Sequence, residues 1–312
     1  MHARTALLTL VLAIPCPVLA RTLTVGRPGT AEFTSISAAM ASAREGDWVE
    51  VGPGRWRELV ELKSGVSLQG AGAQETVLEF DRGSAVIVGK GVRSIRIAGF
   101  TLQHDAGARP CLSPVIGCDA CDQLVIASNT ILGSGFIGIH LSNAGFVKIE
   151  SNRIAENSEA GIWAIGVRNL QVVDNDVADN DGSGMVMVAT EGAVLGNRLS
   201  DNPRRGVLVG RSQAKASRVL VDGNEIRGSR LPVVELGHPA DAQVDFRSNT
   251  CPGSVGGLYV FPYQAPEFPT EIPAPSGELS SDYLDVRPVE TGLLRVLPCV
   301  GPTPAAGGKE SP

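Results

Sequence analysis

The sequence predicts an all-β fold, a single-stranded right-handed parallel β-helix with an N-terminal capping helix. Three observations predict it. An asparagine returns every 22 to 27 residues in the same local setting, a short strand precedes each of these asparagines, and a second short strand recurs after a glycine. Fixed periods of this length are typical of stacked supersecondary units, which bury one continuous core between neighbours.

The asparagine repeat consists of six dipeptides in which the asparagine follows a serine, an aspartate or a glycine. They are Ser128-Asn129, Ser151-Asn152, Asp174-Asn175, Gly196-Asn197, Gly223-Asn224 and Ser248-Asn249, at intervals of 23, 23, 22, 27 and 25 residues. A side-chain amide both donates and accepts hydrogen bonds, so equivalent asparagines can pair from one repeat to the next. We therefore predict an internal asparagine ladder, with a shorter second ladder at Asn157, Asn180 and Asn202.

The strands of each repeat alternate with a period of two. Before the asparagines, the residues expected to point inward are Val147, Ile149, Leu170, Val172, Val219, Val221, Val244 and Phe246. After the recurring glycines they are Ile139, Leu141, Ile162, Ala164, Met185, Met187, Val207 and Val209. Short strands and tight turns leave no room for crossover helices, so each coil must stack directly on the next through parallel strands.

The two ends of the chain differ from the repeats. Residues 1–20 have the layout of a secretory signal peptide, with a basic residue, an apolar run and small residues before the expected cleavage site. We therefore expect an exported protein, periplasmic or extracellular. Residues 34–44 predict an amphipathic helix that caps the open end of the solenoid. The β-helix with its cap is expected over 21–265 and a Pro-rich, partly disordered tail over 266–312.

Composition excludes some partners. The formal net charge is −6 and the basic residues are scattered, which disfavours a nucleic-acid interface and a basic membrane-binding helix. The apolar run of the N-terminus is shorter than the roughly 20 residues that span a bilayer, and no later segment approaches that length. We therefore expect no membrane span.

Cysteines are expected to form disulfides in an exported chain. The candidates are Cys111, Cys118, Cys121, Cys251 and Cys299. Cys251 and Cys299 would pin the tail to the last coils, and Cys111 would close a small loop with Cys118 or Cys121, which leaves one thiol over. A zinc site of Cys118, Cys121, Cys111 and His104 is the alternative, but the second half of a paired-cysteine motif is absent, so no metal site is predicted.

Three segments before the repeats carry a family resemblance. These are Phe33-Thr34-Ser35-Ile36, the run from Gly46 to Gly54 and the run from Gly65 to Gly70. Together with the asparagine repeats, they resemble secreted right-handed β-helix proteins of the pectin lyase-like superfamily over roughly residues 22–260. This superfamily holds polysaccharide lyases, glycoside hydrolases, esterases and epimerases, so the resemblance implies a fold and a substrate class rather than one reaction.

The catalytic motifs of the known enzymes of that superfamily are missing. We find no counterpart of the paired aspartates of polygalacturonases or of the glutamine and aspartate motifs of pectin methylesterases. His238-Pro239-Ala240-Asp241 resembles the Asp-Pro-His-Asp motif of alginate epimerases only weakly. Each of these activities is therefore disfavoured individually.

The outward residues of the strands that follow the glycines form an apolar and aromatic stripe. They are His140, Trp163, Val186, Leu208 and Tyr259. Such superfamily enzymes usually bind substrate along this outer face, and aromatic rings with polar tips suit sugars. We therefore predict that His140, Trp163 and Tyr259 contact a polysaccharide. An exposed apolar stripe needs a cover or a ligand, so a cover by the C-terminal tail or a protein partner stays open.

Charged residues gather at the neighbouring corner. They are Glu156, Glu159, Asp179, Asp181, Arg204, Arg205, Arg227 and Arg230. A lyase or epimerase for acidic polysaccharides needs a cation to neutralise the uronate carboxylate and a base to remove a proton. The catalytic candidates are therefore Arg204, Arg205, Arg230, Asp179 and Asp181, with Ca²⁺ as the one cofactor candidate. Charged turns are also usual on any solvated solenoid corner.

Three functions remain in order of preference. The first is an exported β-helix that engages polysaccharide on its outer strand face without an assignable catalytic site. The second is a lyase or epimerase that acts on an acidic polysaccharide. The third is a structural module of the cell envelope that docks a protein partner or assists the maturation of a metal centre.

Overall fold

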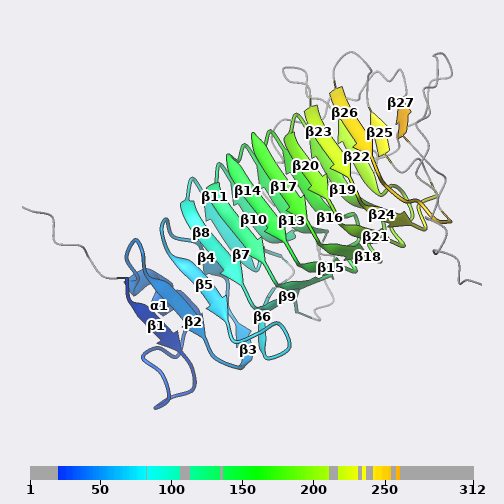
Figure 1. Cartoon of the computed structure of the whole chain (residues 1–312). Coiled ribbons are helices and arrows are strands. Elements are labelled where there is room, and N and C mark those ends of the chain that lie inside the picture. Colours follow the sequence, from blue (N-terminus) through cyan, green and yellow to red (C-terminus); the bar gives the residue numbers. More distant parts are fainter. Residues whose placement is uncertain are drawn as a thin grey trace, which may run out of the picture.

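Each repeat forms one coil of short parallel strands, and the coils stack so that their strands build three long sheets (Figure 1). A computed structural model describes residues 20–81, 83–105, 113–133, 136–210, 217–230, 234–236, 242–253 and 258–260. At 234–236, 242–243 and 258–260 it describes the backbone alone. The chain visits the sheets in a fixed order, which we name A, B and C.

Sheet A has ten strands, each hydrogen-bonded to the equivalent strand of the next coil. They are β1 (Thr22–Val25), β2 (Trp48–Val51), β5 (Ser67–Gly70), β8 (Arg93–Ala98), β11 (Asp122–Ala127), β14 (Phe146–Glu150), β17 (Asn169–Val173), β20 (Glu191–Leu195), β23 (Ser217–Asp222) and β26 (Ala242–Arg247).

Sheets B and C have eight and nine strands. Sheet B holds β3 (Gly54–Arg57), β6 (Thr76–Phe80), β9 (Thr101–His104), β12 (Thr130–Leu132), β15 (Arg153–Ala155), β18 (Asp176–Ala178), β21 (Arg198–Ser200) and β24 (Glu225–Arg227). Sheet C holds β4 (Val60–Glu61), β7 (Ile87–Lys90), β10 (Pro114–Asp119), β13 (Ile137–Ser142), β16 (Ala160–Ile165), β19 (Ser183–Val188), β22 (Val207–Gly210), β25 (Val234–Leu236) and β27 (Leu258–Val260).

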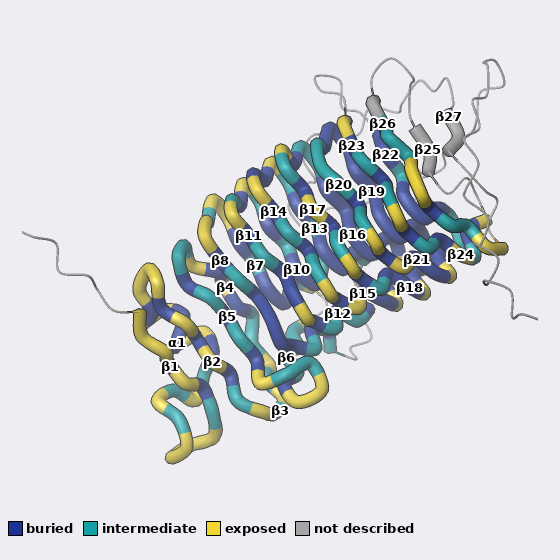
Figure 2. The backbone as a smooth tube through the Cα atoms, viewed as in Figure 1, coloured by how far each residue is buried: buried dark blue, intermediate teal, exposed yellow. Residues whose placement is uncertain are grey.

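The period of two separates the interior from the surface, as the sequence predicts. The predicted inward residues of sheet C and of β14, β17 and β23 are all at most 3% exposed and belong to one continuous core. Along the tube, buried positions alternate with more exposed ones (Figure 2). Val244 and Phe246 are only partly buried, because β26 is the edge strand of sheet A among the described residues.

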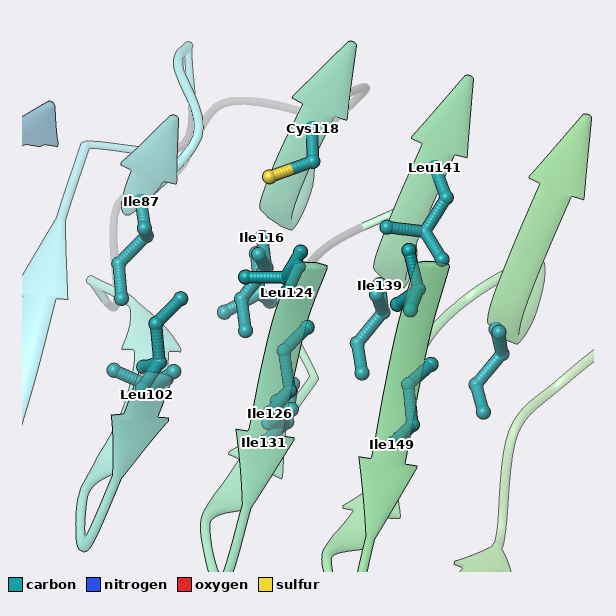
Figure 3. Close-up of a cluster of buried hydrophobic side chains, with 14 of the residues drawn as sticks. Ile87, Leu102, Ile116, Cys118, Leu124, Ile126, Ile131, Ile139, Leu141 and Ile149 are labelled. Atoms are coloured by element: carbon teal, nitrogen blue, oxygen red, sulfur yellow. The ribbon is translucent and has the colours of Figure 1, made fainter. Parts of the chain in front are cut away.

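Aliphatic side chains of equivalent positions stack along the axis of the core. Figure 3 shows Ile116, Leu124 and Ile131 of one coil beside their counterparts Ile87 and Leu102 in the coil before. All five side chains are at most 1% exposed. Burial of this kind is the dominant favourable contribution to folding, at about 25 cal/mol per Å² of apolar surface.

The predicted asparagine ladder is present at the corner between sheets A and B. Each buried asparagine donates from Nδ2 to Oδ1 of the next, with distances of 2.8 to 3.2 Å from Asn129 through to Asn249. The same Oδ1 atoms also accept from the backbone N–H groups one coil earlier. In the coil before Asn129 this position holds the buried Phe100, whose N–H donates to Asn129 Oδ1 at 3.1 Å.

A left-handed residue before each asparagine makes the corner tight. The φ angles are between 50° and 65° at Ser128, Ser151, Asp174, Gly196, Gly223 and Ser248. Glycine adopts this conformation without strain, and aspartate tolerates it better than most residues because its side chain bonds locally. The same arrangement recurs in the second ladder, where Asn157 donates to Asn180 at 2.8 Å and Asn180 to Asn202 at 2.9 Å.

The predicted helix over 34–44 is present as α1 (Ile36–Ser42), shorter at both ends. Ser35 is its N-cap and accepts a hydrogen bond from the Ala38 N–H. Ile36, Ala39 and Met40 are buried against the first strands. That α1 caps the end of the solenoid stays a prediction.

The ends of the chain are largely outside the described residues. The predicted signal peptide, of which only Ala20 is described, and the Pro-rich tail over 266–312 stay predictions. Within the described part of the chain, no helix is both long and apolar enough to cross a membrane.

Candidate functional site

The outer face of sheet C carries the predicted stripe. Register pairs align His140 of β13 with Trp163 of β16, then with Val186 of β19 and Leu208 of β22. The column continues through Glu235 of β25 to Tyr259 of β27 in backbone register. The side chain of Tyr259 lies outside the described residues, so its predicted contact with a sugar stays a prediction.

The stripe is part of a second apolar cluster that is separate from the core. We call it the outer cluster. Its buried members are Ile137, Ala160, Trp163, Val186, Val188 and Ala189, and the partly buried Phe136, Ile165 and Leu208 pack against them. Trp163 is 8% exposed. Its ring is therefore covered rather than open to solvent, and a ligand reaches it only if that cover moves.

Two ring nitrogens of the stripe lack hydrogen-bond partners among the described residues. They are Nε2 of His140 and Nε1 of Trp163, and both atoms are buried. The two residues are register neighbours on adjacent strands. A buried polar group without a partner costs about 1–3 kcal/mol, so two such groups side by side mark a place where a ligand with hydroxyl groups would gain hydrogen bonds.

His140 is a neutral imidazole at neutral pH. Burial lowers its pKa to about 4, and the nearby Asp119 carboxylate opposes this shift. A neutral imidazole both donates and accepts a hydrogen bond, which matches the character of a sugar hydroxyl. The arrangement therefore suits a neutral polar group better than an anion.

The corner that precedes sheet C contains a partly buried ion pair. Arg204 Nη1 lies 2.7 Å from Glu159 Oε1, and the side chain of Glu159 is 9% exposed against 41% for that of Arg204. Burial raises the pKa of Glu159, and the guanidinium of Arg204 opposes the shift. Glu159 is thus a carboxyl group whose proton is held more tightly than in water.

A glycine lies between the two members of this pair. Ser183 N donates to Glu159 O at 2.9 Å, and Arg204 N donates to Gly182 O at 3.0 Å. A Cβ at Gly182 would lie 1.8 Å from the carbonyl oxygen of Glu159. The pair therefore spans two coils and depends on a position without a side chain, which spacing in the sequence does not reveal.

The joint action of the predicted catalytic residues stays a prediction, and the structure describes the surroundings of each of them. Asp179 and Asp181 are exposed, and Asp179 Oδ2 lies 3.9 Å from Arg153 Nη2. Asp179 has a φ of 55° and is the corner residue before Asn180, which gives it a structural role.

The predicted arginines lie in different environments. Arg205 is 8% exposed and Arg230 is exposed, its N–H donating to Pro203 O at 3.1 Å. The ion-pair partner of Arg204 is Glu159 rather than either aspartate.

The cysteines divide into two groups. Cys118 and Cys121 are free, buried thiols. Cys251 is disulfide-bonded, and because Cys299 lies outside the described residues, its predicted pairing with Cys251 stays a prediction. The predicted link of Cys111 to Cys118 or Cys121 is wrong for this structure, because both thiols are free.

The histidine of the alternative zinc site has another partner. His104 is buried and its Nε2 lies 3.0 Å from Ser84 O. Across the described residues, no group of three or more histidine, cysteine, aspartate or glutamate side chains is placed to hold a metal ion. Ca²⁺ binding at the charged corner stays a prediction.

A cleft of about 520 Å³ lies at the other end of the molecule, where β1, β2 and β5 end. Its lining includes Thr24, Arg27, Glu50 and Gln69. It belongs to the first coils and is not part of the face that carries Trp163. We therefore place the candidate site on the outer face of sheet C and the corner before it.

Comparisons with known proteins agree with this architecture. Residues 114–262 match a family model described as the right-handed β-helix region. No curated protein matches the sequence. Pectin methylesterase PemA from Erwinia chrysanthemi has a TM-score of 0.50 at 11% identity, over 76% of this chain and 90% of that chain. The A-module of mannuronan C-5 epimerase AlgE4 from Azotobacter vinelandii has a TM-score of 0.51 at 19% identity, over 68% of this chain and 70% of that chain.

Identities this low establish a shared fold and not a shared reaction. The expectation of a parallel solenoid is confirmed by the strand register of all three sheets and by the family model. The chain folds as a right-handed parallel β-helix, and residues 114–262 match the family model of that region.

Proposed function

We propose that this protein binds a polysaccharide along the outer face of sheet C, with His140 and Trp163 in direct contact with the sugar. The observation that carries the proposal is the pair of neighbouring, buried ring nitrogens that lack partners among the described residues. Sugar rings combine apolar faces with hydroxyl groups. The indole ring would stack on the apolar face, and the two ring nitrogens would bond to the hydroxyls.

The fold supports this choice of ligand class. The neighbours named above are a pectin methylesterase and a mannuronan epimerase, and their names refer to polysaccharides. Repeating coils also suit a repeating ligand, because equivalent positions recur along one face of the molecule. Tyr259 would extend the contact along the same column. Because the N-terminus resembles a signal peptide, we propose that this binding occurs outside the cytoplasm.

Binding requires the cover of the outer cluster to shift, since Trp163 is only 8% exposed. The affinity therefore includes the cost of uncovering apolar surface, about 25 cal/mol per Å². A long polymer that contacts several coils would offset this cost better than a monosaccharide. We expect oligosaccharides to bind with an affinity that rises with their length.

Affinity gel electrophoresis tests the proposal. The full chain is run through gels that contain pectic, alginate or glycosaminoglycan polymers, and we expect retardation in at least one of them. Trp163→Ala, His140→Ala and Tyr259→Ala should each reduce it. Phe146→Ala is the matched control, because Phe146 is an aromatic residue that is 59% exposed on sheet A.

Two results would contradict the proposal. Wild-type migration that is unchanged in every gel would exclude binding to these polymers. The double variant with Trp163→Phe and His140→Phe lacks both ring nitrogens. If it is retarded as much as wild type, the ring nitrogens make no contact with the sugar. Phenylalanine keeps an aromatic ring at both positions, and circular dichroism of the double variant separates loss of binding from unfolding.

A second candidate function is a lyase or epimerase for acidic polysaccharides. The raised pKa of Glu159 beside Arg204 favours it, because a proton-transfer group works best with a pKa near the working pH and an arginine can neutralise a uronate. Rising ultraviolet absorbance from unsaturated uronate products would detect a lyase, with Ca²⁺ present and absent. Turnover should then be lost in Glu159→Gln and Arg205→Ala. Unchanged absorbance with every polymer would exclude lyase activity on these polymers.

A further inference from the structure

Two cysteines meet inside the corner between sheets C and A. Cys118 points inward from β10, among the core residues Ile116 and Leu141 (Figure 3). Cys121 lies directly before β11. Their exposed fractions are 2% and 1%. Neither thiol takes part in the sites described above.

A glycine in the preceding coil makes room for both sulfur atoms. Cys118 pairs in register with Gly89 of β7. A Cβ at Gly89 would lie 2.9 Å from Cys118 Sγ and 3.0 Å from Cys121 Sγ, closer than real Cβ contacts allow. Both sulfurs therefore lie over the same glycine and next to each other.

Hydrogen bonds give the two thiols different roles. The Cys118 thiol donates to the sulfur of Cys121, which also accepts a hydrogen bond from the Val92 N–H. The hydrogen bonds that Cys121 accepts stabilise its thiolate and lower its pKa. The hydrogen bond that Cys118 donates is lost when Cys118 ionises, which raises the pKa of Cys118. Of the two thiols, Cys121 therefore loses its proton more readily, and while protonated it donates to Asp119 O at 3.8 Å.

We propose that Cys118 and Cys121 are a site of oxidative modification, at which the two sulfurs join in a disulfide bond across the corner. The oxidant is a small disulfide of the glutathione class. The Cys121 thiolate attacks one sulfur of that disulfide and releases one glutathione thiolate, which takes up a proton. Cys118 then gives up its proton and attacks the Cys121 sulfur, and the second glutathione leaves as a thiol. Two cysteine thiols are oxidised and one glutathione disulfide is reduced.

The local backbone suits this bond. Only Asp119 and Ala120 separate the cysteines, and Ala120 turns the chain with a φ of 52°. The sulfurs are already in hydrogen-bond contact, so they need only a short approach to reach the roughly 2.05 Å of a disulfide. Because the pair is local in sequence, the bond can form during refolding, once the preceding coil with Gly89 and Val92 is in place and before the next coil covers the corner.

Peptide mapping tests the pairing. The full chain is refolded in buffers of increasing oxidised to reduced glutathione ratio, alkylated and digested without reduction by a protease that cleaves before aspartate. Cleavage before Asp119 and Asp122 separates a three-residue peptide with Cys121 from the peptide that ends at Cys118. We expect the two peptides to be linked in oxidising buffer and to separate on reduction.

Two variants make the assignment unambiguous, because the peptide that ends at Cys118 also contains Cys111. In Cys111→Ser the link should persist. In Cys118→Ser the second step is blocked, so Cys121 should accumulate as a mixed disulfide with glutathione. Alkylation of both cysteines in the most oxidising buffer, or loss of the link in Cys111→Ser, overturns the proposal. Neither result bears on polysaccharide binding.

Discussion

Glu159 and Arg204 form an ion pair that spans two coils of the solenoid, with 2.7 Å between Oε1 and Nη1 and 45 residues between them in sequence. Hydrogen bonds along the sheets join only adjacent coils, whereas this pair links the turns that precede β16 and β22, two strands that are not neighbours. The missing side chain of Gly182 permits the link. Four predictions follow from this pair, from the stripe of sheet C and from the ladder.

Replacing Gly182 by alanine should destabilise the protein by about 2 kcal/mol, because the new Cβ would meet a backbone carbonyl at 1.8 Å and the strand must shift. The urea midpoint of unfolding, followed by circular dichroism, measures the effect. Gly210→Ala is the matched control on sheet C, since its Cβ would meet only the Val188 side chain at 3.6 Å. An equal change in both variants would contradict the prediction.

The carboxyl group of Glu159 should make stability depend on pH. Its pKa is raised above the ordinary 4.5, so the folded state favours the protonated form. The resulting stability is present below pH 4.5 and is lost as pH rises through the pKa of the folded state. Glu159→Gln should therefore gain stability relative to wild type between pH 4 and pH 7. Urea midpoints at several pH values test this, with Glu156→Gln, an exposed carboxyl on the same turn, as control.

His140 should have the opposite dependence. Its pKa falls to about 4 from an ordinary 6.5 because burial disfavours the charged ring. The stability from the neutral ring is complete above pH 6.5 and is lost as pH falls through 4. His140→Gln should thus lose less stability than wild type on acidification from pH 7 to pH 4. Proton magnetic resonance of the imidazole gives a direct check, and titration of His140 near 6.5 would contradict the prediction.

An asparagine in the middle of the ladder should matter more than the last one. Asn175 bonds to Asn152 and Asn197 on either side and to the carbonyl of Ile149 at 2.9 Å. Its replacement by alanine leaves buried groups on both sides unpaired and should cost on the order of 3 kcal/mol. Asn249 bonds to only one ladder neighbour, Asn224, among the described residues. Asn249→Ala should therefore lower the thermal midpoint less, and equal losses would argue against a ladder that acts through both neighbours.

Much of the fold could be predicted because its determinants are local and repeat. The left-handed residue and the asparagine of Asp174-Asn175 are adjacent in sequence, and the alternation of Ile139, His140 and Leu141 follows from strand geometry alone. The recurring glycines were visible as a pattern. The sequence does not show why glycine is needed at these positions, because the cause lies in the next coil. A Cβ at Gly161 would meet the carbonyl oxygen of Gly184 at 2.9 Å.

The candidate site was less predictable because its determinants are long-range. Period-two alternation correctly identifies Trp163 as outward-facing but does not show whether other parts of the chain cover it. Spacing gathered the charged residues at one corner but did not reveal that Arg204 pairs with Glu159 two coils away. The reason Cys118 and Cys121 fit together is Gly89, about one coil earlier in the chain. In each case the contacts of a residue in one coil depend on residues in another coil.

The asparagine ladder also makes the coils interchangeable. Each internal asparagine presents an acceptor to the coil before it and a donor to the coil after it, in the same orientation throughout. These hydrogen bonds are the same in every coil, so they do not distinguish one coil from another. A deletion that joins Ser151 to Asn175 would preserve the hydrogen-bond pattern, whereas removing half a coil would break it. The length of this protein is therefore adjustable in whole coils, and the surface that it offers to a ligand grows or shrinks by the same unit.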